Sequence, residues 1–384
     1  MLPDGWRKTK LGKCVDIKSG VAPSNLPLKR YGKYPYVKVE DMNNCSKFQK
    51  ESREYTDYNH NYIRSGAVIF PKRGAAIMNN KVRISINGIY LDSNMMALQP
   101  NSETTSEFLY YLITFCGLFK IADTSTIPQI NNKHILPYPI LLPPLPEQKK
   151  IAAILSTWDR AIEGTERLLA NSQQQKKALM QQLLTGKKHL PGFTGDWIWK
   201  RSKEIFKSIS IKNNPMDCEL LSVTQDQGVV LRSSLERRVV MPDGSVQGYK
   251  LVNPGNFIIS LRSFQGGLEY SYFRGLVSPA YTVLENKIEI ENEFFKFYFK
   301  SYDFIGHLAV ATIGIRDGKQ ISYEDFSFIK LPYPPLPEQK AIAAVLTAAD
   351  KEITAIESDL SRLRQEQKAL MQQLLTGKRL VAVD

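Results

Sequence analysis

The sequence predicts two mixed α/β domains that alternate with two long α-helices, the whole arising by tandem duplication. The chain has 384 residues, more than one hydrophobic core usually organises. A 45-residue segment occurs twice, and each copy has the features of one long helix. The block before each copy contains short runs of Val, Ile, Tyr and Phe, broken by Gly, Asn and Pro, which is typical of strands and turns.

The repeated segment divides the chain. Its copies are Pro143–Lys187 and Pro334–Lys378, and 27 of their 45 positions are identical at a constant offset of 191. The same offset relates Trp6 to Trp197 and Gln129 to Gln320, so the duplication extends beyond the helices. We therefore expect a first domain at 1–142, a central helix within 143–189, a second domain at 190–333 and a C-terminal helix within 334–384.

Both ends of each helix are marked. The N–H groups of a first helical turn have no acceptor within the helix, so proline, which lacks an N–H, costs no hydrogen bond there. The helices are therefore expected to begin near Pro146 and Pro337. Each copy closes on Leu-Leu-Thr-Gly-Lys, which places Gly186 and Gly377 where a left-handed C-terminal cap is favoured. At about 1.5 Å per residue, each helix would be about 55 to 60 Å long.

Apolar residues recur at alternating steps of three and four, the heptad pattern of a coiled coil. Polar side chains interrupt this seam at Ser172, Lys176 and Gln367, where they would fix the register, and Gly164 was a candidate for a bend or a close approach. An ordinary pair of core helices is the alternative interpretation. The predicted apolar seam comprises Ile151, Leu155, Trp158, Ile162, Leu169, Leu179 and Leu183, with Ile342, Leu346, Ile353, Ile356, Leu360, Leu363, Leu370 and Leu374.

The two variable blocks show the same order of elements: strands, an arginine-bearing loop, a helix, and a polar loop that ends in Gln-Ile. In the first block, strands are expected within residues 34–42, 66–77 and 81–92, and a helix over 107–119. In the second, strands are expected within 255–267 and 275–285, and a helix over 292–308.

Charge points to a polyanionic partner. The net charge is +13, of which residues 1–142 carry +8, residues 143–189 carry +4 and residues 190–333 carry +1. A basic surface that merely keeps the protein soluble is the competing explanation. If the partner is DNA, the first domain should rely more on phosphate contacts than the second.

The polar loops contain side chains of the types that hydrogen-bond to base edges and phosphates. No helix-turn-helix or zinc-finger spacing accompanies them. The DNA-contact candidates in the first block are Lys72, Arg73, Asn79, Asn80, Lys81, Gln129, Asn131, Asn132 and Lys133, with His134 beside them; in the second they are Arg262, Ser263, Gln265, Arg316, Lys319 and Gln320.

Motifs for catalysis are missing. The sequence has no phosphate-binding GxxxxGK[ST] loop, no HExxH, no GxSxG and no NPPY-like segment of an adenine methyltransferase. Its four histidines and four cysteines lack metal-ligand spacing, and Asp217 with Glu219 lacks the lysine that would complete a nuclease site. We expect no metal site, no catalytic residues and no cofactor in this chain. The absence of a signal sequence and of a long apolar span predicts a cytoplasmic protein.

Two different blocks that alternate with two near-identical helices, opened by PPLPEQ and closed by LLTGK, resemble the specificity subunit (HsdS) of type I restriction-modification systems. The resemblance covers essentially the whole chain. It implies that each block is a target-recognition domain for one half of a bipartite DNA sequence, and that the helices pack antiparallel as a spacer. It also implies two modification subunits that use S-adenosylmethionine, and restriction subunits that use ATP and Mg²⁺.

Two other functions stay open at this point. The chain could be a non-catalytic coiled-coil scaffold that joins protein partners, which explains the helices but not the basic first block. It could also be a nuclease that acts alone. Retention of DNA in a competition gel, and nicking of a plasmid with a divalent metal, distinguish these from a recognition subunit.

Overall fold

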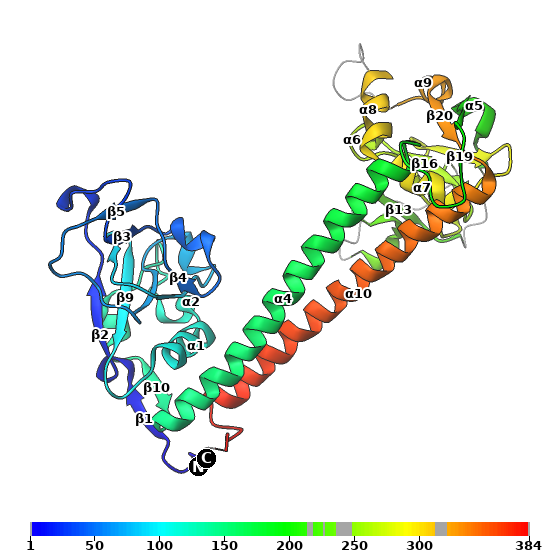
Figure 1. Cartoon of the computed structure of the whole chain (residues 1–384). Coiled ribbons are helices and arrows are strands. Elements are labelled where there is room, and N and C mark those ends of the chain that lie inside the picture. The colour runs from blue at the N-terminus through cyan, green and yellow to red at the C-terminus, as the bar shows by residue number, and fades with distance from the viewer. Residues whose placement is uncertain (1, 213–217, 226, 236–247, 312–320, 383–384) are drawn as a thin grey trace. The chain divides into compact units, whose positions relative to one another are not determined.

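The computed structural model describes residues 2–212, 218–225, 227–235, 248–311 and 321–382, and side chains at 309–311 are outside that description. The chain forms two compact units, residues 1–166 with 359–384, and residues 167–358. Each unit therefore contains one variable domain and one half of each long helix (Figure 1). Among the described residues, no helix combines the length and apolarity needed to span a bilayer.

The first domain, described throughout residues 2–142, is a mixed α/β fold. A five-stranded sheet has the order β2-β9-β6-β7-β4, a three-stranded sheet the order β5-β3-β8, and β1 pairs with β10. The strands are β1 Arg7–Lys10, β2 Val15–Ser19, β3 Tyr34–Val37, β4 Phe48–Gln49, β5 Glu54–Thr56, β6 Val68–Pro71, β7 Arg83–Ser85, β8 Tyr90–Leu91, β9 Met95–Pro100 and β10 Pro139–Leu142. The helices are α1 Ser106–Cys116, α2 Leu118–Ile121 and α3 Asn132–Ile135, with short 3-10 helices at Leu11–Lys13, Pro23–Asn25, Asp41–Asn44 and Ala75–Ile77.

The second domain repeats the plan with fewer strands in its main sheet, β12-β19-β16-β17, among the residues described. Smaller pairs are β13 with β14, β15 with β18 and β11 with β20. Its strands are β11 Ile198–Arg201, β12 Phe206–Ile209, β13 Leu221–Thr224, β14 Gly228–Leu231, β15 Lys250–Val252, β16 Phe257–Ile259, β17 Glu269–Tyr270, β18 Gly275–Val277, β19 Thr282–Asn286 and β20 Lys330–Tyr333. Its helices are α5 Ser202–Ile205, α6 Ser263–Gly266, α7 Asn292–Phe299, α8 Tyr302–Ala311 and α9 Tyr323–Phe328, with a 3-10 helix at Arg232–Ser234.

The predicted strands and domain helices are confirmed in kind but not in extent. Each expected domain helix is interrupted: Gly117, at φ 79°, separates α1 from α2, and Lys300–Ser301 separates α7 from α8. The stretch predicted as one strand over 255–267 is strand β16 followed by the short helix α6. Here the backbone N–H of Ser260 donates to Ser263 Oγ (2.8 Å), a local bond that turns the chain out of the sheet.

The two long helices are confirmed. Helix α4 spans Leu145–Leu183 (39 residues) and α10 spans Leu336–Leu375 (40 residues). Both caps are left-handed as predicted, with Gly186 at φ 70° and Gly377 at φ 68°. Gly164 lies inside the continuous helix α4, and a Cβ there would have no neighbour within 4 Å, so the predicted close approach at Gly164 is wrong.

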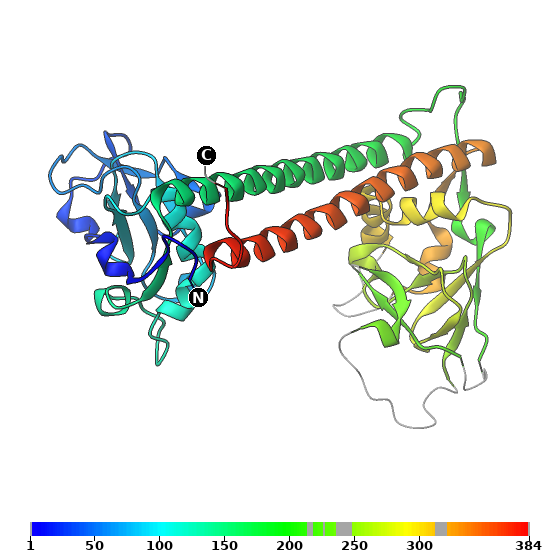
Figure 2. The ribbon, with the colours of Figure 1, turned by 90° about the horizontal axis from the view of Figure 1, so that it is seen from below.

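Within each unit the helices pack antiparallel. In the first unit, Ile151 and Leu155 near the start of α4 share a core with Leu374 near the end of α10 and with the first domain. In the second unit, Leu183 near the end of α4 shares a core with Ile342 and Leu346 near the start of α10. Figure 2 shows the end of α4 beside the beginning of α10.

Burial supports the predicted seam. Ile151, Leu155, Leu183, Ile342, Leu346, Ile356, Leu360 and Leu374 are buried, whereas Trp158, Ile162, Leu169, Leu179, Ile353, Leu363 and Leu370 are partly buried. The helix ends are therefore part of the domain cores, and among the predicted seam residues outside those cores only Ile356 and Leu360 are buried.

Candidate nucleic-acid interface

In the first domain, two polar loops that are far apart in the sequence lie side by side. The backbone N–H of Gly74 donates to the carbonyl of Pro128 (2.9 Å), and the N–H of Ile130 donates to the carbonyl of Lys72 (2.9 Å). Arg73 and Gln129 form an antiparallel bridge between them. The candidates at 72–81 and at 129–134 therefore share one surface.

The candidate side chains on this surface differ in availability. Arg73, Asn79, Asn131, Asn132 and Lys133 are exposed, whereas Lys72, Asn80, Lys81, Gln129 and His134 are partly buried. Exposed amides and cations of this kind can reach base edges or phosphates.

Three of the partly buried candidates have partners inside the domain. Asn80 donates from Nδ2 to the carbonyl of Thr114 (2.8 Å), and its Oδ1 accepts from the N–H of Leu118 (2.9 Å), so it holds α1 against α2. Lys81 donates to Asn43 Oδ1, and His134 Nδ1 accepts from the N–H of Asn131 (3.1 Å). The structure thus gives Asn80 a clear role in the fold.

Lys72 has an unusual environment for a surface lysine. Burial lowers its pKa, the neighbouring Arg73 lowers the pKa further, and Asp92 opposes both effects. A lysine with a lowered pKa gains from a nearby anion, because the anion restores the preference for the charged form. A DNA phosphate would supply that charge.

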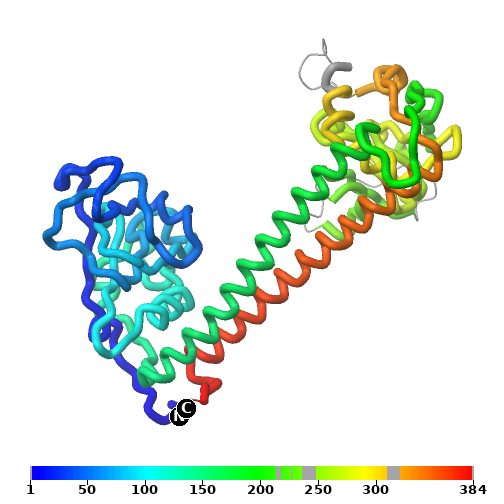
Figure 3. The backbone as a smooth tube through the Cα atoms, in the orientation of Figure 1, coloured from blue at the N-terminus to red at the C-terminus, as the bar shows by residue number. Residues whose placement is uncertain are grey.

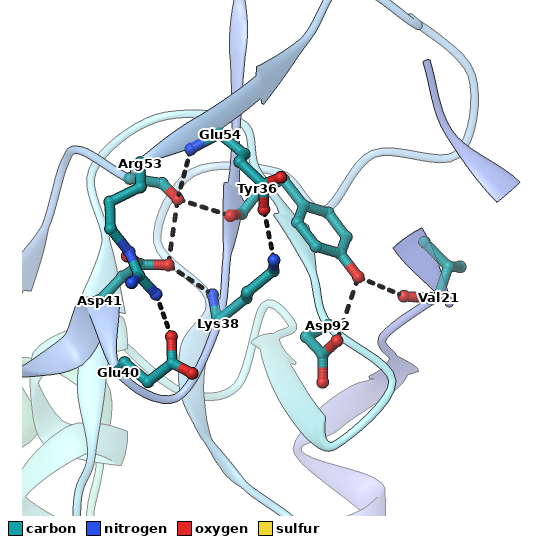
Figure 4. A network of polar contacts seen from close by, with 9 residues as sticks. Val21, Tyr36, Lys38, Glu40, Asp41, Arg53, Glu54 and Asp92 are labelled. Carbon is teal, nitrogen blue, oxygen red and sulfur yellow. Dashed lines mark hydrogen bonds and ion pairs between the residues drawn. The ribbon is translucent and has the colours of Figure 1, made fainter. Parts of the chain in front are cut away.

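A polar network that we did not foresee from the sequence supports this loop (Figure 4). The Tyr36 hydroxyl donates to the carbonyl of Val21 (2.8 Å) and to Asp92 Oδ2 (3.2 Å). Asp92 Oδ1 accepts from the N–H of Asn94 (2.9 Å), whose carbonyl accepts from the N–H of Lys72 (2.8 Å). Burial raises the pKa of Tyr36, and Asp92 adds to the rise, so the hydroxyl keeps its proton and remains a donor.

The buried carboxylate of Asp41 anchors the other side of the same network (Figure 4). It accepts from the backbone N–H of Lys38 (2.9 Å), from Ser52 Oγ (3.1 Å) and from Arg53 Nε (2.8 Å). The bonds of Tyr36 and Asp41 therefore hold the C-terminal end of strand β3, and Asp92 and Asn94 link that end to the backbone of Lys72.

In the second domain, the candidate loop forms the short helix α6. Arg262 and Gln265 are exposed, but Ser263 is buried and its hydroxyl accepts from the backbone of Ser260, so Ser263 stabilises the turn. Gly267, at φ 75°, follows directly, and a Cβ there would lie 1.8 Å from the carbonyl oxygen of Phe299. Only glycine permits this approach of α6 to the end of α7. Arg316, Lys319 and Gln320 lie outside the described residues.

Each domain is joined to its long helix by a buried hydrogen bond that was not predicted from the sequence. Trp6 Nε1 donates to Glu147 Oε2 (2.8 Å), and Trp197 Nε1 donates to Glu338 Oε2 (2.9 Å). All four residues are buried. The duplicated tryptophans and the two PPLPEQ motifs, at the same offset of 191, were the available signal.

The glutamine of each PPLPEQ motif completes the joint. Gln148 Oε1 accepts from the N–H of Thr105 (3.0 Å), and Gln148 Nε2 donates to the carbonyl of Pro143 (3.0 Å). Gln339 repeats this arrangement with the N–H of Glu291 (2.9 Å) and the carbonyl of Pro334 (2.8 Å). Each motif therefore connects the start of a long helix to the cap of the domain helix.

The polar seam residues have partners on the opposite helix. Gln367 Nε2 donates to Asp159 Oδ1 (2.6 Å) in the first unit, and Lys176 forms an ion pair with Asp350 in the second. Asp350 is Asp159 displaced by 191 residues, and Gln367 is Lys176 displaced likewise. Ser172 Oγ also donates to Glu352 (3.1 Å). These bonds satisfy only one alignment of the helices, as a register-fixing role requires.

No group of three or more His, Cys, Asp or Glu that could hold a metal ion occurs among the described residues. Residues 3–171 and 196–363 each match the family model of the type I restriction modification DNA specificity domain. The chain belongs to this family. The double match coincides with the duplication, and it supports DNA recognition rather than a general scaffold.

Known members of the family are similar over nearly the whole chain. The MjaVIII type I restriction enzyme specificity subunit of Methanocaldococcus jannaschii is 24% identical over 98% of this chain and 93% of its own length. The type I S subunit of M. genitalium has a TM-score of 0.61 at 16% identity, over 96% of each chain. The HsdS subunit of Thermoanaerobacter tengcongensis has a TM-score of 0.51 at 19% identity, over 98% of each chain. At these identities the solved structures support the fold.

Proposed function

We propose that this specificity-family chain reads a bipartite, asymmetric DNA target, with one half-site for each variable domain. The observation that carries the proposal is that both domains use the same tryptophan, glutamate and glutamine joint but present different loops to solvent. Two unlike half-sites require two domains that are attached to the helices in the same way but expose different side chains to the DNA. The base contacts come from the exposed loop residues, chiefly Arg73, Asn131 and Lys133 in one domain and Arg262 and Gln265 in the other.

The helix pair acts as the spacer in this proposal. Helix α4 is one continuous helix whose two halves belong to different units, and the polar seam pairs fix its register against α10. At about 1.5 Å per residue, its 39 residues exceed one turn of DNA, which is about 34 Å. Such a spacer can set the number of unread base pairs between half-sites.

The catalytic work belongs to partners in this proposal. Two modification subunits would bring S-adenosylmethionine and methylate adenine, and restriction subunits would bring ATP and Mg²⁺. This chain would contribute no catalytic residue and no cofactor site, and the complex would act on DNA in the cytosol.

The direct test is long-read methylome sequencing of a strain that expresses the chain with its partner subunits. We expect one asymmetric motif with two half-sites and a constant gap. Arg73→Gln should relax or abolish one half-site only, and Arg262→Gln the other only. A motif that is unchanged in both variants, or methylation without any motif, would overturn the proposal.

The spacer role has its own test. Matched insertion of one heptad in the middle of α4 and in the middle of α10 adds about 10 Å to the pair. The gap should widen by up to about three base pairs, since DNA rises about 3.4 Å per base pair. Altered half-sites with an unchanged gap would contradict the spacer role.

A further inference from the structure

The charged residues at the end of α4 and in the turn after it are all basic. From Arg167 to Lys187 the sequence contains four basic residues and no acidic one. The matching stretch of α10, Ser358–Lys378, also has four basic residues, but it includes Asp359 and Glu366. There Arg362 pairs with both acids. The net charge is therefore 4-0 = +4 in the first stretch and 4-2 = +2 in the second.

Part of this cationic segment lines a cavity of about 560 Å³ inside the second unit. One wall is the end of α4 with the turn after it, and its lining residues include Lys176, Lys177 and Lys187. The other wall is the turn between α7 and α8 with the start of α8, and it includes Lys300. Lys177 and Lys187 are exposed, and no ion pair to either is found among the described residues. Lys176 and Lys300 are neutralised by Asp350 and Glu269 respectively.

The remaining lining is mostly uncharged and polar. Gln173, Gln181 and Ser301 can donate hydrogen bonds into the cavity, whereas the Thr185 hydroxyl donates to the carbonyl of Gln181 (2.9 Å). Its one acidic member, Asp303, accepts a hydrogen bond from the Tyr298 hydroxyl (3.2 Å) and lies 3.8 Å from His307 Nδ1. Two ammonium groups without an ion pair in the described part of the chain, together with the amide and hydroxyl donors, favour an anion as the occupant.

The cavity adjoins the reading loop of the second domain. Lys300 Nζ donates to the carbonyl of Gly266 (2.9 Å), the last residue of α6, and Gly267 fixes α6 against Phe299. Gln265 lies on α6, and Arg262 directly precedes that helix. Figure 1 shows α6 and α8 together in the second domain, near the end of α4. An anion bound in this cavity would therefore lie next to the molecule that α6 binds.

We propose that Lys177 and Lys187 bind phosphodiester groups of the DNA backbone beside the second half-site. The second domain has a net charge of only +1 over residues 190–333, so it supplies little of the electrostatic attraction that DNA binding needs. The central helix provides the missing positive charge. Lysine ammonium groups, as point charges, hold phosphates without reading sequence.

This inference rests on the proposed function, and its test separates the two. Full-length protein, assembled with its modification subunits, is titrated against a short duplex that carries the motif found by methylome sequencing, over a range of salt. In Lys177→Gln/Lys187→Gln, the slope of log affinity against log salt should fall by about two. Affinity at about 0.15 M salt should fall about ten- to thirty-fold, with the motif unchanged.

Two matched variants control the experiment. Lys368→Gln/Lys378→Gln removes the exposed lysines at the equivalent positions of the second copy of the repeat, and it should leave the slope nearly unchanged. Lys177→Arg/Lys187→Arg keeps the charge and should retain the parent slope. Ethylation of phosphates next to the second half-site should impair binding of the parent but not of the glutamine variant.

The outcomes are distinct. If the parent binds the duplex and the glutamine variant keeps its slope, the phosphate site is disproved while the proposed function stands. If the glutamine variant instead loses the modification subunits at an unchanged slope, the surface binds an acidic protein segment and the inference is overturned. If the parent shows no preference for the motif duplex, the proposed function fails and this inference fails with it.

Discussion

The two halves of the molecule share a frame and differ in the polar residues attached to it. The pairing of β1 with β10 and that of β11 with β20 have the same register, Arg7 opposite Leu142 and Ile198 opposite Tyr333, at the offset of 191. The buried tryptophan and glutamate pairs agree within 0.1 Å, at 2.8 and 2.9 Å. The duplication has therefore preserved the way a domain is mounted on the helices.

The differences lie next to that frame. Asp159 accepts from Gln367 and from the Tyr111 hydroxyl, and the buried Lys47 lies 3.6 Å away. Its counterpart Asp350 pairs with Lys176, whose ammonium group lies over the ring of Phe297. Glu338 has a second partner, His189 Nδ1 (2.8 Å), whereas Glu147 Oε1 is buried with none among the described residues. The halves should thus respond differently to equivalent substitutions.

Lys47→Met should give the largest effect, confined to the first unit. The ammonium group lies 2.9 Å from Glu107 Oε2 and 2.8 Å from the Tyr111 hydroxyl. Its removal leaves the carboxylates of Glu107 and Asp159 without this cation. We expect a loss of about 2 to 3 kcal/mol in the free energy of unfolding of that unit. Hydrogen exchange measured on peptides from each unit reports it, with the exposed Lys50→Met as control. Equal loss of protection in both units would contradict the assignment.

Trp6→Phe and Trp197→Phe should lower the stability by different amounts, although the two positions are equivalent in the repeat. Each removes an indole N–H from a buried carboxylate, but Glu338 retains His189 and Glu147 retains no second partner in the described structure. We expect costs of about 2 and about 1 kcal/mol respectively, again by unit-resolved hydrogen exchange. Trp199→Phe, on the exposed side chain of β11, is the control. A larger cost at Trp197 would show that His189 contributes nothing.

Alanine substitutions of two glycines in the same repeat should change the stability in opposite directions. Gly164→Ala fills open space within α4 and should raise stability by up to about 1 kcal/mol. Gly186→Ala should lower it by about 1 kcal/mol, because φ is 70° and a Cβ would lie 3.2 Å from the ring of Trp197. Thermal denaturation of the full chain measures both. Stabilisation at Gly186 would mean that its cap conformation is not required.

The smallest effect concerns pH and belongs to the first domain. Because the pKa of Lys72 is lowered, the free side chain loses its proton at a lower pH than an ordinary lysine does. If it holds a phosphate, affinity for DNA should decline as pH rises through that lowered pKa. Lys72→Arg keeps its charge, so the decline in affinity should occur at higher pH. At any one pH, the affinities of the variant and the parent should differ by less than about five-fold. Identical pH profiles would exclude a charged contact by Lys72.

The helices could be predicted almost completely from the sequence because their signals are local and repeated. Proline starts, glycine caps and a heptad seam each depend on a few neighbouring residues, and both copies carry all three. The domain strands were less predictable. Over residues 255–267, apolar content indicated one strand, but the hydroxyls of Ser260 and Ser263 close a turn that only the folded backbone reveals.

The candidate interface shows the same limit. In the first domain, the types of side chain indicated two loops that lie side by side in the structure, but type alone does not give the direction in which a side chain points. Asn80 and Ser263 face inward to hold local structure, while Arg73 and Arg262 face solvent. The tryptophan and glutamate joints were hidden because they connect residues 141 positions apart, and no local pattern reports such a pair.

The equal registers of the two edge strand pairs make each variable block an interchangeable part. Everything between β1 and β10, or between β11 and β20, enters and leaves the frame through the same geometry. A gene of this layout can exchange one block by recombination at those borders while the contacts between α4 and α10 are retained, and the incoming block has to re-form only its own contacts with the helices, such as those of Thr105 with Gln148 and Tyr111 with Asp159.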